Sequence, residues 1–223
     1  MRPSLPRDRF TVVAEHRSGE DRDFLRVWHR RLRRRRADGS WSAPFQCDCV
    51  DRRLGMDAVA MVLHARGADG TARVGLRPSL RPALALPPTG LGVGTELEAS
   101  ARLWEIPAGV LEAGDDGEPG QRHRCSLESH EEMGLIVPDE AFSALGGPVV
   151  LSPGVMAERI WIYAAAVDPA LAGAPAGDGS PMEDDTEPVW LSLAEALALC
   201  EAGQADAKTE VALRRFATQV RED

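Results

Sequence analysis

Apolar residues recur with two different periods along the chain. Short apolar runs predict strands at 57–64, 73–76, 159–167 and 189–191. After the last run, Ser192 and Glu195 have the spacing of a capping box, which predicts a helix over 193–201. An amphipathic segment that starts near Ala207 predicts a final helix. Strands interleaved with capped helices along 57–217 favour an α/β fold, an α/β/α sandwich with a mixed central sheet.

A separate β-hairpin is expected near the N-terminus. Residues 24–53 hold two strand-like runs joined by an Asp38-Gly39 turn. The first run is rich in arginine, and in an acidic chain an edge-protecting strand is favoured over a nucleic-acid surface. A lone hairpin is marginally stable in water, so its aromatic residues predict a homodimer interface. We therefore divide the chain into an N-terminal extension over 1–56, with a role in dimerisation, and a domain over 57–223.

Composition narrows the class of protein. Hydrophobic residues make up 43% and charged residues 27% of the chain, as in an ordinary globular protein. The net charge of −9 argues against a nucleic-acid partner, whose binding surface is normally basic. No apolar run reaches the roughly 18 residues of a membrane span, and the N-terminal segment lacks the apolar core of a signal peptide. The four cysteines lack metal-site spacing, so a reduced, cytoplasmic protein is expected.

Three glutamates form the candidate chemical centre of the chain. Glu128, Glu131 and Glu132 stand at relative positions i, i+3 and i+4, so a helix would project them from one face. Like charges placed in this way repel each other unless a cation lies against them. Hard oxygen ligands of this kind suit Mg²⁺ or Mn²⁺. A solvated acidic helix face is the alternative.

The surrounding residues resemble the Nudix box, written G-x5-E-x7-R-E-U-x-E-E-x-G-U with U apolar. The matching positions are Gly109, Glu128, Glu131, Glu132, Gly134 and Leu135. The lead-in WEIPAG at 104–109 is typical of the ADP-ribose pyrophosphatase branch of that family, as is the SPG-x-x-x-E segment at 152–158. The resemblance covers about residues 57–217 and implies the Nudix sandwich.

The box departs from the family pattern in four places, one of which is Ser129 at the apolar position after Glu128. Asp115 replaces the first glutamate, and a four-residue insertion separates it from the second part of the box. Leu127 replaces the arginine that precedes Glu128, so the carboxylates lose a positive neighbour and metal affinity should fall. Arg122 and Arg124 are the candidates to replace that cation. The box helix is expected to begin between residues 120 and 126.

The resemblance implies a set of site residues. The metal ligands would be Glu128, Glu131, Glu132 and the Ala108 carbonyl. The substrate-binding residues would be Arg77, Arg81, Ser152, Gly154 and Glu158. The catalytic residues would be Glu132 and a general base among Glu183, Asp184 and Asp185. Guanidinium groups suit diphosphate oxygens because they bind them bidentately, although ordinary surface arginines are the alternative for the arginine pair.

The implied function is metal-dependent hydrolysis of a nucleoside diphosphate sugar. ADP-ribose is the first candidate substrate, with AMP and ribose 5-phosphate as products. In relatives, an N-terminal ribbon packs across a two-fold axis and helps to build the partner's substrate pocket. The alternative is a catalytically weak or inactive Nudix domain that binds a nucleotide or serves as an interaction module.

Overall fold

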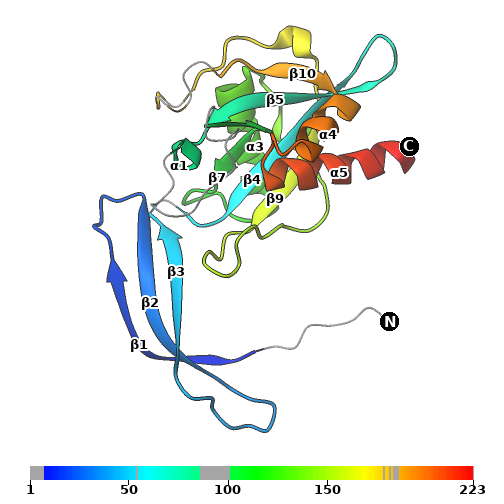
Figure 1. Ribbon diagram of the computed structural model, residues 1–223. Coiled ribbons are helices and arrows are strands. Elements are labelled where there is room, and N and C mark those ends of the chain that lie inside the picture. The colour runs from blue at the N-terminus through cyan, green and yellow to red at the C-terminus, as the bar shows by residue number, and fades with distance from the viewer. Residues whose placement is uncertain are drawn as a thin grey trace. The chain divides into compact units, whose positions relative to one another are not determined.

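The computed structural model describes residues 8–53, 55–85, 101–177, 179–180, 182 and 186–222 (Figure 1). The chain forms two compact units. The first, here called the N-terminal sheet unit, contains residues 1–56 and 152–158. The second, the α/β unit, contains residues 57–151 and 159–223. The sequence division did not foresee that the segment 152–158 would join the N-terminal sheet.

The N-terminal sheet unit is an antiparallel sheet with the strand order β1-β2-β3. Its strands are β1 (Phe10–Ser18), β2 (Leu25–Arg34) and β3 (Phe45–Arg52). The predicted hairpin of β2 and β3 is confirmed, and its turn is shaped by Gly39 at φ +83° and by an Asp38 side chain that accepts a hydrogen bond from the Ser40 amide. Outside the hairpin, the Val50 amide donates to the Val155 carbonyl at 2.7 Å, which fixes the segment 152–158 beside β3.

The α/β unit is built on a seven-stranded mixed sheet within the described residues. Its strands are β4 (Ala58–Arg66), β5 (Ala72–Leu80), β6 (Arg102–Glu105), β7 (Ala108–Val110), β8 (Ser143–Ala144), β9 (Ile160–Ala166) and β10 (Val189–Ser192). The main order is β10-β5-β4-β9-β8, while β6 pairs with β5 and β7 with β4. The β4–β9 pair is parallel and the other pairs are antiparallel.

Helices cover both faces of this sheet (Figure 1). They are α1 (Pro82–Ala85), α3 (Gly117–Met133), α4 (Leu193–Glu201) and α5 (Ala207–Glu222), with short 3-10 turns η1 (Asp139–Ala141) and η2 (Pro169–Leu171). Because successive strand residues face opposite ways, β4 serves two cores. Ala60 and Val62 belong to the core that contains Leu213 of α5, whereas Met61 belongs to the core that contains Cys125 of α3. The predicted α/β/α sandwich with a mixed sheet is confirmed.

The ends of the helices show which local signals were decisive. The capping box of Ser192 and Glu195 is present at the start of α4, as predicted. Helix α3 ends at Gly134, whose φ of +66° is suited to glycine and whose added Cβ would overlap the Gly173 carbonyl. The predicted start of α3 was wrong, because the helix begins at Gly117 rather than between residues 120 and 126. Residues 117–119 are therefore helical, although the sequence placed them before the helix.

Within the described part of the chain, no helix combines the length and the apolar character needed to cross a membrane.

Candidate active site

Helix α3 brings two of the predicted carboxylates against the short strand β7. Its buried residues Gln121, Cys125, Ser129 and Met133 recur every four positions and pack toward the sheet. The neighbouring carboxylate of Glu132 accepts a hydrogen bond from the Ala108 amide at 2.9 Å. A Cβ added at Gly109 would overlap the Glu128 carboxylate, so only glycine allows this close approach. The structure thus joins Ala108, Glu128 and Glu132 in one place.

Arg77 on β5 is the direct cationic partner of this cluster. Its side chain is buried and forms an ion pair through Nη1 with Glu132 Oε1. Its Nη2 donates to the Thr186 hydroxyl at 3.3 Å. Arg77 was expected from the resemblance to bind substrate; its contacts with Glu132 and Thr186 were not. The guanidinium therefore connects the box helix to the segment that leads into β10.

Arg81 directly follows the end of β5 and is held by a different carboxylate. Glu105 on β6 accepts from Arg81 Nε at 2.6 Å and from Arg81 Nη2 at 2.5 Å. Glu105 is buried, whereas about half of the Arg81 side chain is exposed. Lys208 of α5 also forms an ion pair with Glu105 and a second one with Asp206. Because about half of its side chain remains exposed, Arg81 is accessible to a ligand although Glu105 holds it.

The charges around Glu105 keep it ionised despite its burial. Burial alone would raise the pKa of Glu105, but the hydrogen bonds and positive charges of Arg81 and Lys208 outweigh it and lower the pKa below its ordinary value. In turn, the hydrogen bond with Glu105 raises the pKa of Arg81. Two weak signals for this network are present in the sequence: Glu105 stands in the WEIPAG lead-in, and Lys208 is the single lysine of the chain.

Arg124 occupies the neighbourhood that the missing box arginine would serve. Its Nε lies 2.9 Å from Asp115 Oδ2, and its Nη1 lies 3.9 Å from Glu128 Oε1. Burial opposes the charge of Arg124, but its acidic neighbours, led by Asp115, raise its pKa above the ordinary value. Arg122 instead pairs with Glu118 one turn away on α3. Of the two candidate replacements, the structure brings only Arg124 to the carboxylates.

Three of the other predicted site residues belong to the N-terminal sheet unit. Ser152 and Gly154 are exposed residues of the N-terminal sheet unit. Glu158 belongs to the same unit, where it is buried in an ion pair with Arg52. The general-base candidates Glu183, Asp184 and Asp185 lie outside the described residues.

The oxygen atoms of the cluster are of the kind that bind a hard divalent cation, but Glu132 already contacts other groups of the protein. Carboxylate oxygens of Glu128, Glu131 and Glu132 and the Ala108 carbonyl are ligands that Mg²⁺ and Mn²⁺ accept. Among the described residues, however, no three His, Cys, Asp or Glu side chains are grouped closely enough to hold a metal ion. The two carboxylate oxygens of Glu132 contact Arg77 and the Ala108 amide. A cation would have to displace or share these partners.

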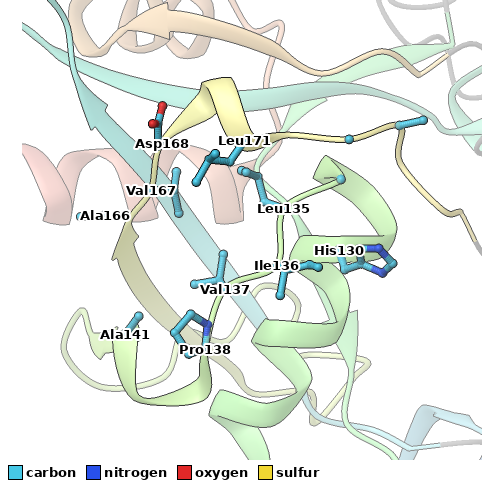
Figure 2. Close-up of a pocket in the computed structure, with 13 residues that line it drawn as sticks. His130, Leu135, Ile136, Val137, Pro138, Ala141, Ala166, Val167, Asp168 and Leu171 are labelled. Carbon is cyan, nitrogen blue, oxygen red and sulfur yellow. The ribbon is translucent and has the colours of Figure 1, made fainter.

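A cavity of about 590 Å³ lies beside the C-terminal end of α3 (Figure 2). Leu135, Ile136 and Val137 line it from the segment after α3, and Val167 and Leu171 line it from the segment after β9. None of the predicted metal or arginine residues is among its lining residues. This cavity is therefore distinct from the carboxylate cluster.

Comparisons with known proteins find similarity among solved structures. No protein-family model matches the chain, and no curated protein sequence matches it. A NUDIX hydrolase from Alicyclobacillus acidocaldarius is 15% identical, with 72% of this chain and 90% of that chain covered and a TM-score of 0.49. A NUDIX hydrolase from Nitrosomonas europaea is 15% identical, with 74% and 90% covered and a TM-score of 0.48. The C-terminal domain of mouse MUTYH, solved in complex with human PCNA, is 21% identical, with 74% and 89% covered and a TM-score of 0.43.

Proposed function

We propose that this chain is a Nudix-type hydrolase that cleaves the pyrophosphate bond of a nucleoside diphosphate sugar with the help of Mg²⁺ or Mn²⁺. ADP-ribose is the first candidate substrate, with AMP and ribose 5-phosphate as products. The observation that carries the proposal is the close approach of Ala108 and Gly109 to Glu128 and Glu132, with Arg77 against the same carboxylates. A surface helix with merely solvated glutamates would need neither this glycine nor this buried arginine.

The proposed metal ligands are Glu128, Glu131, Glu132 and the Ala108 carbonyl. A divalent cation held there would neutralise the negative charge of the diphosphate oxygens and lower the pKa of a bound water. Negative charge on the substrate is the main obstacle to attack by water, so positive charge near the diphosphate is the principal need of this reaction. Arg77 of β5 and Arg81, which follows it, supply the remaining positive charge near the diphosphate.

Arg81 is the proposed substrate clamp. A guanidinium has five N–H donors, and Glu105 takes two of them, which leaves three that can reach phosphate oxygens. Fixing the guanidinium in advance reduces the conformational entropy lost on binding. Because Lys208 also neutralises Glu105, the carboxylate does not cancel the attraction of Arg81 for an anion. The general base is proposed to be one of Glu183, Asp184 and Asp185, and Thr186, the next residue in sequence, supports this choice through its hydrogen bond with Arg77.

We also propose that the N-terminal sheet unit forms a homodimer interface. Its strands expose Phe10, Val12 and Phe45 by 40–55%, although apolar side chains of this size are normally covered. Residues 1–56 carry fourteen arginines against eight carboxylates, whereas residues 57–223 carry twelve basic side chains against twenty-seven. The basic sheet of one copy is thus complementary in charge to the acidic remainder of another.

Light scattering tests the dimer directly. The expected mass is twice the 24.1 kDa of one chain at micromolar concentration. Phe45→Asp would place a charge on the apolar face and should yield monomers, while Val13→Asp at the bulge of β1 is a control at a different surface position. A monomeric wild-type protein would contradict the proposal.

The engaged carboxylates also support a second candidate, a nucleotide-binding domain with little or no turnover. One screen separates the two functions. ADP-ribose, other nucleotide sugars, dinucleoside polyphosphates and nucleoside triphosphates are incubated at increasing Mg²⁺ or Mn²⁺ concentration, and products are identified by chromatography. Saturable, metal-dependent release of AMP from ADP-ribose is expected. Binding of the same compounds without any product would instead establish the second candidate.

A further inference from the structure

Strand β2 carries arginines on both faces of the N-terminal sheet. Because successive side chains of a strand point to opposite faces, these arginines form two rows. The first row is Arg26, Arg30 and Arg34. The second row is Arg31 and Arg33, and it is extended by Arg35, which directly follows the strand in an isolated bridge with Trp41. Arg31, Arg33 and Arg35 are here called the arginine stripe.

Each arginine of the first row has a carboxylate partner. The pairs are Arg26–Asp51 at 2.9 Å, Arg30–Glu15 at 3.0 Å and Arg34–Asp8 at 2.8 Å. The strand register places the exposed side chains of Phe10 and Phe45 on the same face. This face is therefore balanced in charge and partly apolar, which suits the proposed contact with a second copy.

The arginine stripe lacks such partners. In the part of the chain that the structure describes, no carboxylate forms an ion pair with any of its three members, and all three are exposed. Their neighbours across the strands are the uncharged residues Thr11, Ala14 and Gln46. Asp48 lies on this face as well, but it contacts His29 at 3.2 Å. The stripe is thus a row of uncompensated positive charges.

The net charge of the whole chain conceals this surface. Residues 1–56 have a surplus of six positive charges, since they carry fourteen arginines and eight carboxylates. The acidic residues that make the chain negative belong mainly to residues 57–223. The argument from net charge against a nucleic-acid partner therefore holds for the average of the chain and not for the N-terminal sheet unit.

The spacing of the stripe suits a partner with regularly repeated anions. Alternate residues of a strand are about 6.8 Å apart, so the three guanidinium groups stand at even intervals along one line. A guanidinium binds phosphate oxygens bidentately, and arginine is favoured over lysine wherever this planar recognition is used. An extended phosphate backbone that runs along β2 can meet all three groups.

Trp41 adds a planar surface at one end of the stripe. Its side chain is 38% exposed, and the guanidinium carbon of Arg35 lies 5.3 Å from the centroid of its ring. Bases of single-stranded nucleic acids stack on aromatic rings and on guanidinium planes. Proteins that bind single strands with little sequence preference combine such a platform with a track of positive charge. An acidic polypeptide also offers repeated anions but has no base to stack.

We propose that the arginine stripe and Trp41 form a binding surface for single-stranded nucleic acid. The three guanidinium groups contact neighbouring phosphates, and one base stacks on the Arg35–Trp41 pair. All of these residues belong to the N-terminal sheet unit, so the proposal is independent of the proposed hydrolase function. It is also compatible with the proposed dimer, because Phe10 and Phe45 lie on the opposite face of the sheet.

Fluorescence anisotropy of labelled oligo(dT) and oligo(U), each about 20 nucleotides long, tests the proposal with the full chain. Binding is expected at low salt, and three phosphate contacts predict that log K falls with log salt concentration with a slope of about −2. Absence of binding to both probes at about 50 mM salt would overturn the proposal. So would displacement of the probe by poly-glutamate at equal charge concentration, since the partner would then be an acidic polypeptide.

The two rows of β2 supply matched variants for the same assay. Arg31→Gln and Arg33→Gln should each weaken binding at least about threefold and make the salt slope shallower by about 0.7. Arg34→Gln and Arg30→Gln remove the same charge from the opposite face and should stay within about twofold. Tm values identify any variant that is poorly folded. Equal weakening by both rows would show a general charge effect and contradict the assignment of the face.

Trp41 is tested by separating its ring from the charges around it. Trp41→Ala should weaken binding at least about fivefold without changing the salt slope, because it removes a stacking surface and no cation. Trp41→Phe keeps an aromatic ring and should stay within about twofold of the wild type. A duplex of the same length should bind at least about threefold more weakly than the single strand, since its bases are already stacked. Equal binding of duplex and single strand, or an unchanged affinity of Trp41→Ala, would refute the single-strand assignment.

Discussion

The two units of this chain are stabilised in different ways. In the α/β unit, the six residues from Ala58 to Leu63 on β4 are all buried, and they contribute alternately to two cores. In the N-terminal sheet unit, no apolar side chain among residues 8–53 is buried, and every residue of β1 is exposed. One unit therefore holds itself together by apolar burial, whereas the other has strand pairing without a core of its own.

The ion pairs of the two units also differ in how deeply they are buried. Ion pairs join neighbouring strands of the N-terminal sheet, among them Arg26–Asp51 and Arg30–Glu15. The side chains of these pairs are partly exposed. Such pairs contribute about 0–1 kcal/mol each and cannot replace a core. In the α/β unit, ion pairs such as Arg77–Glu132 and Lys208–Glu105 are buried and converge on one region. The comparison supports two of the proposals made above, namely that the α/β unit carries the chemistry and that the sheet forms an interface with another copy.

The largest expected effect follows from removing a carboxylate in each unit. Glu132→Gln should lower turnover of the hydrolysed substrate at least about 100-fold, because it removes a proposed metal ligand. Asp48→Asn on β3 removes the same charge from the N-terminal sheet and should leave turnover within about twofold. Steady-state rates at saturating Mg²⁺ provide the measurement. Full activity of Glu132→Gln would refute the metal-site assignment.

The next effect concerns the cores. Leu213 of α5 is completely buried, so Leu213→Ala should reduce the free energy of unfolding by about 3 kcal/mol. Leu32 of β2 is only partly buried, so Leu32→Ala should cost less than about 1 kcal/mol. Urea unfolding monitored by tryptophan fluorescence compares the two variants. Similar losses would show that another surface covers the sheet in solution, which light scattering would then have to reveal as a dimer.

Acid should destabilise the α/β unit through Glu105. Its pKa in the folded protein is lowered, because the contributions of Arg81 and Lys208 outweigh the effect of burial. The resulting stabilisation is complete above the pKa of an unfolded glutamate, about 4.3, and is lost as pH falls through the lower folded value. Glu105→Gln should therefore be less stable than the wild type at neutral pH and lose less additional stability below about pH 4. Parallel loss in both proteins would mean that Glu105 contributes nothing to the acid response.

Local sequence signals predicted much of the α/β unit and little of its charge network. The buried run of β4, the capping box at Ser192 and the glycine after α3 each act within a few residues, so a single stretch of sequence reveals them. Helix α3 starts before the predicted residues although Asp116 makes no side-chain capping bond and Pro119 lies in the first turn, where proline is tolerated.

The candidate site was predictable only where its residues share one helix. The i, i+3, i+4 spacing identified the glutamates. The i, i+4 relation between Arg124 and Glu128 can be read from the sequence as well. The contacts Arg81–Glu105 and Lys208–Glu105 join residues 24 and 103 positions apart. No local pattern encodes such pairs, because they exist only after β5, β6 and α5 have assembled.

The smallest expected effect concerns the residue at which the box departs most clearly from the family. Sequence alone indicated that Leu127 leaves the carboxylates without a cation, so that Leu127→Arg would lower the metal requirement. The structure places Arg124 between Asp115 and Glu128, and Leu127 is 37% exposed on α3. Leu127→Arg should therefore fold, change stability by no more than about 0.5 kcal/mol and leave the metal concentration at half-maximal rate within about twofold.

Arg124→Gln is the informative partner of this variant. Arg124 makes its close contact with Asp115 at 2.9 Å and lies 3.9 Å from Glu128, so it is the cation proposed to orient that carboxylate. Its removal should raise the metal concentration at half-maximal rate by about threefold or more, as the loss of a residue that orients a ligand does. Metal titrations of turnover, with Tm recorded for each protein, compare the two variants. If Leu127→Arg reduced the metal requirement strongly while Arg124→Gln had no effect, Arg124 would not be the replacement cation, and the departure at residue 127 would be a true defect of the site.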